Sequence, residues 1–165
     1  ALVSREVAPL PPALQSHWLP VHAGVAMFSY GFLALAFCGG FMYLVQEWEL
    51  KSKRLGYFFV RLPSLDSLDQ LNRHCLTTGF VFLTLGIITG SLWARQAWGT
   101  YWQWDPKETW SLITWLLYAA QMHQRLTVGW RGRRAAIMAI VGFLSVLFTL
   151  WGVSFLLGGA HSYAQ

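Results

Sequence analysis

Four uncharged, mainly apolar stretches follow one another along this chain, at residues 21–45, 75–93, 109–124 and 135–157. An α-helix rises about 1.5 Å per residue, so about 20 residues cross a hydrocarbon core of about 30 Å. The stretch between Glu108 and Arg125 is the shortest, and its ends must reach into the membrane interfaces. The pattern therefore predicts four transmembrane helices, of which the third is the weakest.

Composition supports this fold class. Hydrophobic residues make up 55% of the 165 residues and charged residues only 12%, whereas an ordinary soluble chain has about 25% charged residues. Cys38 and Cys75 lie in separate apolar stretches, so neither a disulfide framework nor a C-x-x-C motif is available. We expect an all-α integral membrane protein, with one membrane domain over residues 1–165 in a lipid bilayer. Its Trp-rich external loop, at 95–108, lies between helices two and three.

Basic residues predict the orientation of the helices. Nine of the 12 Lys and Arg residues fall in two connections, with Lys51, Lys53, Arg54, Arg61 and Arg73 before the second helix and Arg125, Arg131, Arg133 and Arg134 before the fourth. Short loops rich in Lys and Arg stay on the cytoplasmic or stromal side, which places the loop at 95–108 and both chain ends on the periplasmic or lumenal side. The net charge of +5 does not indicate a nucleic-acid ligand, because these residues flank apolar stretches instead of lining a polar face.

Tryptophan is concentrated in the predicted outer loop. Trp98, Trp102, Trp104 and Trp110 fall within thirteen residues. Indole rings favour the headgroup region of a bilayer, so an aromatic belt is one interpretation. Four indoles on one short connection exceed that need, and they predict a broad, flat, apolar surface for a large planar ligand.

The end of this loop carries the signature of a helix start. Asp105 is suited to the N-cap, proline follows at the first helical position, and Glu108 can close a capping box. The positive end of that helix also favours a ligand carboxylate, with Arg95 or Lys107 beside it. We assign Asp105 and Glu108 mainly to the cap, and both a carboxylate role and a purely structural one stay open for Arg95 and Lys107.

Two histidines lie at helix ends on the predicted outer face, with His22 at the start of the first helix and His161 just after the fourth. One histidine in such a place is more often an interfacial residue than a ligand. Two of them beside an aromatic surface predict the axial ligands of a haem iron, because a porphyrin supplies a flat apolar body and two carboxylates. A structural zinc site would need four ligands. His123 lies about 21 Å along the third helix, where it caps carbonyl groups or belongs to a second site.

Two glycine patterns lie inside the apolar stretches. Gly86-x-x-x-Gly90 predicts a close helix-packing face with no further role. Gly39-Gly40 predicts a bend or a helix end.

The run Trp98-Gly99-x-x-Trp102-x-Trp104-Asp105-Pro106-Lys107-Glu108-Thr109-Trp110 resembles the tryptophan-rich WWD signature of the CcsA/ResC family of system II cytochrome c biogenesis. The resemblance covers nearly all of residues 18–164. It implies that His22 and His161 ligate haem b at the WWD loop. The other residues implied at that site are Trp98, Trp102, Trp104, Asp105, Arg95 and Lys107. It also implies that His123 marks an inner haem site, formed with a CcsB/ResB-like partner subunit.

The implied function is that of a haem-binding and haem-presenting component of the cytochrome c synthase. Haem would pass from the inner site to the outer one, where an apocytochrome c offers its Cys-x-x-Cys-His motif for thioether attachment. The chain would be an enzyme only together with its partner, and we assign no catalytic residue. The family usually carries further helices ahead of the segment that contains His22, so we expect this chain to be a C-terminal portion. The implied location is the bacterial inner membrane or the thylakoid membrane.

Two other functions fit a polytopic, aromatic chain. A b-type haem subunit of an electron-transfer complex would place two histidines on one helix, and no predicted helix here carries a suitably spaced pair. A non-catalytic membrane scaffold with an aromatic belt would bind no haem.

Overall fold

A computed structural model describes residues 12–53, 56 and 60–157. The elements in order are η1 (Pro12–Gln15), α1 (Trp18–Lys51), α3 (Leu65–Trp98), α4 (Pro106–Leu126), α5 (Arg133–Leu147), the π-helical turn η2 (Phe148–Gly152) and α6 (Val153–Leu156). Within the described residues every regular element is helical. The predicted all-α class is therefore confirmed.

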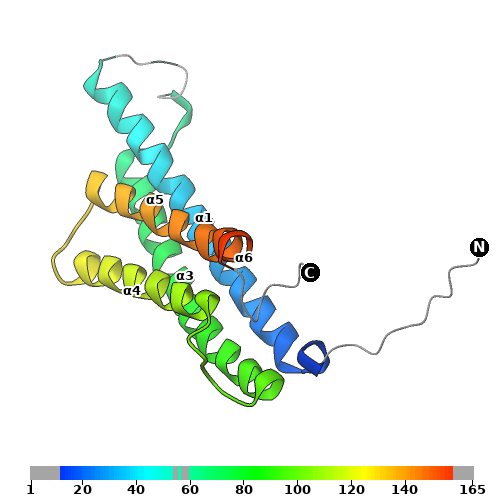
Figure 1. Ribbon diagram of the computed structural model, residues 1–165. Helices are drawn as coiled ribbons and strands as arrows, with labels where there is room; N and C mark the ends of the chain where they lie inside the picture. The colour runs from blue at the N-terminus through cyan, green and yellow to red at the C-terminus, as the bar shows by residue number, and fades with distance from the viewer. Residues whose placement is uncertain (1–11, 54–55, 57–59, 158–165) are drawn as a thin grey trace, which may run out of the picture.

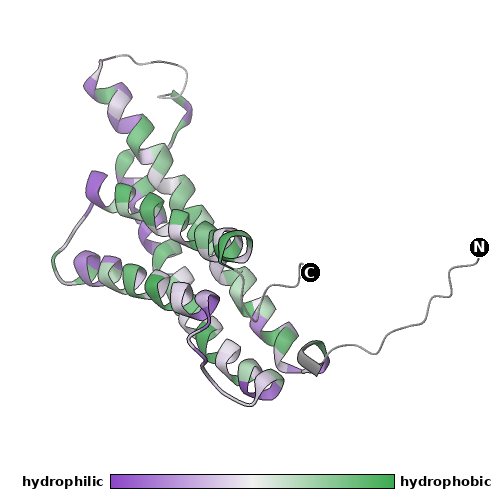
Figure 2. Ribbon diagram, in the orientation of Figure 1, coloured by the Kyte–Doolittle hydropathy of each residue, from purple (hydrophilic) through white to green (hydrophobic). Residues whose placement is uncertain are grey.

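Three of the described helical segments are long and apolar enough to cross a membrane: α1, α3 and the continuous run Arg133–Leu156. Figure 2 shows that α1 is apolar in its middle, with hydrophilic residues toward its ends, and that α5 is apolar after a hydrophilic first turn. α4 covers the predicted third span but is not among the three, so its crossing of the membrane stays a prediction. The chain is thus an all-helical membrane protein with three candidate spans.

The helices are longer than the apolar stretches that predicted them. α1 and α3 each have 34 residues, which corresponds to about 51 Å, whereas a hydrocarbon core is about 30 Å thick. Their ends therefore extend beyond the apolar layer, because helical backbone bonding continues into polar sequence that a hydropathy pattern leaves out. The first turns of α1 and the last turns of α3 lie together at one end of this helix pair.

α1 and α3 run side by side in opposite directions, and α4 and α5 cross them (Figure 1). α5 packs on α1, while α4 contacts both α3 and α5. The buried cluster between them comprises Leu33, Ala36, Cys75, Leu76, Leu83, Tyr118, Met122 and Val146. A single core thus joins all four long helices.

The Gly39-Gly40 pair does not bend or end a helix, and that prediction is wrong. Both glycines are buried inside the continuous α1. A Cβ at Gly40 would lie 2.9 Å from the carbonyl oxygen of Ala136, and one at Gly39 would lie 3.7 Å from the backbone nitrogen of Asn72. The pair therefore lets α5 and α3 approach the backbone of α1 closely.

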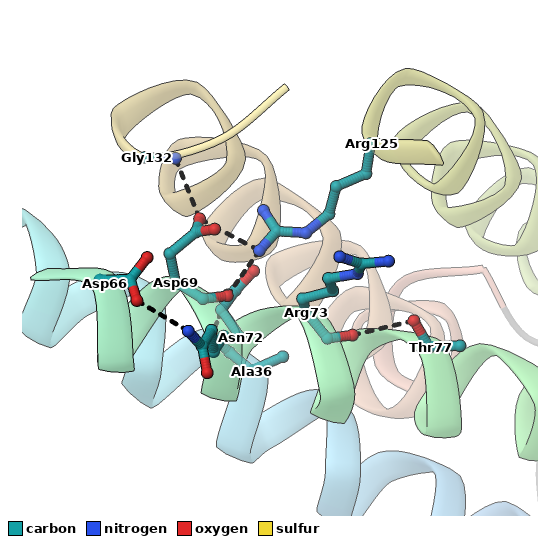
Figure 3. A network of polar contacts seen from close by, with 9 residues as sticks. Ala36, Asp66, Asp69, Asn72, Arg73, Thr77, Arg125 and Gly132 are labelled. Atoms are coloured by element: carbon teal, nitrogen blue, oxygen red, sulfur yellow. Dashed lines mark hydrogen bonds and ion pairs between the residues drawn. The ribbon is translucent and has the colours of Figure 1, made fainter. Parts of the chain in front are cut away.

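A polar junction ties α3 to α4 and to the start of α5 (Figure 3). The Arg125 Nη2 group donates to the Asp69 Oδ1 atom at 3.1 Å and to the Asp69 backbone carbonyl at 2.6 Å. The backbone N–H of Gly132 donates to the same Asp69 Oδ1 atom at 2.9 Å. Gly132 adopts a positive φ of 65°, a conformation that favours glycine. The Arg125 side chain is only 4% exposed, so this residue is a buried anchor and not only a marker of membrane orientation.

Candidate functional site

The connection between α3 and α4 is shorter than the predicted loop at 95–108. α3 continues to Trp98 and α4 begins at Pro106, so Arg95 and Lys107 both lie in helical turns. Gly99 ends α3 in the left-handed conformation with φ at 82°, and its N–H donates to the Arg95 carbonyl oxygen at 2.9 Å. The connection therefore reverses direction at a glycine that directly follows Trp98.

The predicted helix cap at Asp105 is confirmed. Asp105 is the N-cap of α4, Pro106 stands at its first position, and the capping box with Glu108 is complete. Glu108 Oε2 also accepts the backbone N–H of Gln103 at 2.7 Å. Both acidic side chains therefore fix the end of the Trp-rich connection, as expected when carboxylates lie at the positive end of a helix.

The indole rings of the connection do not form one flat surface. Trp102 and Trp104 meet edge to face, with ring centroids 5.9 Å apart and an interplanar angle of 84°. Trp98 instead packs edge-on against Trp93 of α3 at 4.9 Å. Trp104 is 70% exposed and holds a positive φ of 56°, which is strained for a bulky residue. The backbone thus projects Trp104 outward, while Trp102 faces the helices.

His22, Trp102 and Lys107 come together around one cavity with a volume of about 250 Å³. Its wall also includes Trp93 and Tyr101, and it lies where α1, α3, the Trp-rich connection and the start of α4 meet. Thr149 and Leu150 of η2 complete the wall. The predicted fourth helix therefore contains a π-helical turn at the cavity, a feature that is frequent at functional sites.

The imidazole of His22 is held against α3. Its Nδ1 atom lies 3.0 Å from the carbonyl oxygen of Gly86. Its ring stacks on Trp93 with centroids 6.0 Å apart and an interplanar angle of 8°. The first turns of α1 thus present an imidazole whose orientation is set by a helix backbone and an aromatic ring.

Two cations of the site have different surroundings. Lys107 is partly buried in the cavity wall, and its Nζ atom donates to Ser154 Oγ at 3.4 Å. Burial lowers the pKa of Lys107, while the negative charge of Asp105 raises it. Arg95 is exposed; its guanidinium lies 4.7 Å from the Tyr101 ring centroid and donates to the Tyr101 hydroxyl. Lys107 is therefore the cation placed to meet an anionic group inside the cavity.

The remaining predicted site residues lie elsewhere. His123 is exposed near the opposite end of α4, about 24 Å from Lys107 along the helix axis, and its ring lies 3.4 Å from Thr127 Oγ1. His161 lies outside the described residues. Neither a second histidine at the cavity nor an inner site is therefore tested.

Sequence reasoning missed Trp93 and Tyr101 as parts of the cavity wall. Trp93 lies before the predicted loop, and it is 3% exposed and stacks on His22. The available signal was spacing, because Gly86, Gly90 and Trp93 recur at four and three residues and so share one helix face. The Gly86-x-x-x-Gly90 face also contacts His22, which its interpretation as simple packing did not include.

Comparison with known proteins gives the family. Residues 2–161 match the family described as "Cytochrome C assembly protein". The "Cytochrome c biogenesis protein CcsA" of Chlamydomonas reinhardtii is 44% identical over 96% of this chain and 44% of its own length. The proteins of that name from Guillardia theta and Gloeobacter violaceus are 42% and 37% identical, over 96% and 94% of this chain and 58% and 60% of their own lengths.

The chain therefore spans about half the length of the curated relatives it matches. The matched residues include the Trp-rich connection, the capped start of α4 and the segment of α1 that carries His22. On this evidence the chain belongs to the cytochrome c assembly protein family and, within it, to the CcsA proteins.

Proposed function

We propose that this chain is the haem-binding and haem-presenting part of a cytochrome c synthase. The family acts in cytochrome c maturation, which involves haem. The observation that carries the proposal is the cavity that gathers an imidazole, aromatic rings and a partly buried ammonium at His22, Trp93, Trp102 and Lys107. These groups match the three parts of haem b, which are an iron that accepts imidazole, an apolar macrocycle and two carboxylates.

The size of the cavity indicates how such a substrate would be held. Its volume of about 250 Å³ is below the range of about 300–1,000 Å³ that is typical of sites for whole ligands. Haem would therefore lie only partly in the cavity, with its iron at His22, and leave the rest of the ring accessible. Lys107 and the positive end of α4 would receive a carboxylate, and Trp102 would cover part of the ring. His161 would supply the second axial ligand.

The chemistry that this arrangement supports is positioning. The vinyl groups of haem react with the two thiols of the Cys-x-x-Cys-His motif in an apocytochrome c. A substrate held in a fixed orientation beside those thiols reacts in an almost intramolecular step, which removes much of the entropic barrier. We assign no general base among the cavity residues. A CcsB/ResB-like partner subunit would complete the synthase, and His123 would belong to an inner haem site at that interface.

The alternative function, a b-type electron-transfer subunit, is less well supported. Bis-histidine haem sites of that kind draw paired histidines from the same helices. Among the described helices, α1, α3 and α4 contain one histidine each, namely His22, His74 and His123, and α5 contains none.

Replacing Trp102 with alanine tests the cavity as the haem site. We expect haem bound per full-length protein, purified with its partner, to fall about two- to tenfold, because a ring contact is worth about 0.5–1.5 kcal/mol. The absorption spectrum of the membrane fraction measures this ratio. Trp48 is exposed at the far end of α1, and Trp48→Ala serves as the matched control that keeps its haem. Equal haem content in both variants would argue against the cavity.

The proposed orientation puts the Trp-rich connection on the periplasmic or lumenal side of a bacterial plasma membrane or a thylakoid membrane. Single cysteines introduced at Thr100 and Gly129, in a cysteine-free background, lie in the connections on either side of α4. A membrane-impermeant thiol reagent should label the first from the outer side and the second only after the membrane is opened. Labelling of both from the same side would overturn the proposed orientation and the crossing by α4.

A further inference from the structure

α1 packs against α3 at a surface that contains two glycines one helical turn apart, Gly86 and Gly90. A Cβ at Gly86 would lie 3.9 Å from Ala26 Cα, which is an ordinary contact. A Cβ at Gly90 would lie 3.0 Å from His22 Nδ1, which is a tight contact, and 2.9 Å from His22 Cε1, which is closer than real Cβ atoms approach another heavy atom. The missing side chain at Gly90 therefore leaves the space that the imidazole occupies.

The contact with Gly86 determines which nitrogen of His22 carries the proton. A backbone carbonyl oxygen accepts hydrogen bonds and cannot donate them. At 3.0 Å from the Gly86 carbonyl oxygen, the Nδ1 atom must be the donor. In a neutral imidazole the lone pair then resides on Nε2, which is the nitrogen that can coordinate a metal in this tautomer.

Trp93 restrains the same ring from another side. Its indole is nearly parallel to the imidazole, at an interplanar angle of 8°, and is itself 3% exposed. Because Gly86, Gly90 and Trp93 all belong to α3, one rigid helix contributes the hydrogen-bond acceptor, the space and the stacking surface.

We propose that Gly90 and the backbone carbonyl of Gly86 are positioning residues that fix the tautomer and the orientation of His22, so that Nε2 is offered to the haem iron. This inference rests on the proposed function, because it assigns a role in preparing the ligand of that site. The Gly86-x-x-x-Gly90 face then holds the imidazole in place in addition to packing against α1. Groups that orient a metal-binding histidine typically contribute about 10–100-fold to metal affinity.

The first experiment introduces a Cβ at Gly90, into the space that the imidazole occupies. Gly90→Ala in the full-length protein, purified with its partner, should lower haem affinity about 10–100-fold and change the axial-ligand signature in the electron paramagnetic resonance spectrum. Gly24→Ala is the matched control, because a Cβ at that glycine, two residues after His22, meets nothing within 4 Å. Gly90→Ala with an unchanged spectrum and affinity would overturn the proposal.

A second experiment distinguishes a loss of the space for the imidazole from a loss of folding. In a His22→Gly background the ring that collides with the new Cβ is absent, so adding Gly90→Ala should leave the membrane level of the protein unchanged. Free imidazole should restore haem binding to His22→Gly, and about tenfold more imidazole should be needed when Gly90→Ala is also present. Equal restoration in both backgrounds would contradict a role for Gly90.

The hydrogen bond to Gly86 is tested by a change of ligand. Imidazole can donate an N–H to the Gly86 carbonyl while its other nitrogen binds iron, whereas N-methylimidazole cannot donate. N-methylimidazole should therefore restore haem binding to His22→Gly about two- to tenfold less well, as expected for one hydrogen bond. Equal restoration by both ligands would overturn the assignment of Gly86.

These outcomes separate the inference from the function on which it rests. If His22→Gly keeps wild-type haem content and an unchanged spectrum, the proposed haem site itself fails. If His22→Gly loses haem while Gly90→Ala behaves like wild type, the haem site stands and only the positioning role fails.

Discussion

Replacing Arg125 with leucine should lower the free energy of unfolding by about 3–5 kcal/mol. The Arg125 guanidinium is 4% exposed and its partner Asp69 is 15% exposed. Removal of the arginine leaves the Asp69 carboxylate in the interior with only the Gly132 N–H among its described contacts. An uncompensated buried charge is costly, and the loss should separate α4 from α3. Unfolding of the purified protein in mixed micelles of increasing SDS content measures the change.

A double replacement shows whether the effect comes from the unpaired charge. Arg125→Leu combined with Asp69→Leu should recover most of the loss, because a buried ion pair replaced by apolar residues is often neutral in stability. A residual cost of about 1 kcal/mol is expected, since the Gly132 N–H loses its acceptor. Lys51→Ala removes the exposed partner of Glu47 and should cost less than about 1 kcal/mol. Additive losses in the double variant would show that the two residues act independently.

Replacing His22 with alanine should reduce both haem content and the yield of holocytochrome c at least about tenfold, equivalent to about 1.4 kcal/mol or more in haem binding. The imidazole is the only histidine side chain among the described residues that lines the cavity. The measurement is the haem stain of a co-produced apocytochrome c, made with the full-length protein and its partner. Folding should be unaffected, because α1 keeps its contacts with α3 outside this ring.

The control for His22 is another histidine on a helix. His74→Ala alters an exposed side chain of α3 and should leave holocytochrome c unchanged. Equal yields from His22→Ala and the wild type would remove His22 from the site. A loss in both variants would indicate that the assay reports general damage to the bundle.

Local features of the fold were predictable from sequence because their causes lie within a few residues. The capping box at Asp105 and Glu108 is formed by groups three residues apart, and both the residue types and the spacing are visible in the sequence. The three candidate spans follow from uninterrupted apolar runs. The first three helices extend beyond both predicted ends, because polar residues beyond the apolar runs continue the same backbone bonding.

Features that join distant segments could not be derived in this way. Asp69 and Arg125 are 56 residues apart, and His22 and Gly86 are 64 apart. Their pairing depends on the register and crossing of the helices, which the apolar pattern leaves undetermined. For the same reason, Arg125 was interpreted only through membrane orientation, although it anchors the buried junction.

The candidate site contains both features that were predictable from sequence and features that were not. Trp102 and Lys107 follow from the WWD segment, and His22 from its place at a helix start. The sequence did not indicate that Trp102 and Trp104 are perpendicular, or that Trp93 stacks on His22. These arrangements depend on side-chain packing between α1 and α3 and within the connection. The same sequence is compatible with many combinations of side-chain rotamers there.

The most direct test is a density map of the full-length protein purified with haem and its partner subunit. We predict planar density that lies partly in the cavity beside Trp102, with the iron bonded to Nε2 of His22 while Nδ1 keeps its contact with Gly86. Lipid density filling the cavity, or haem found only near His123, would contradict the assignment of this cavity as the place where haem is presented.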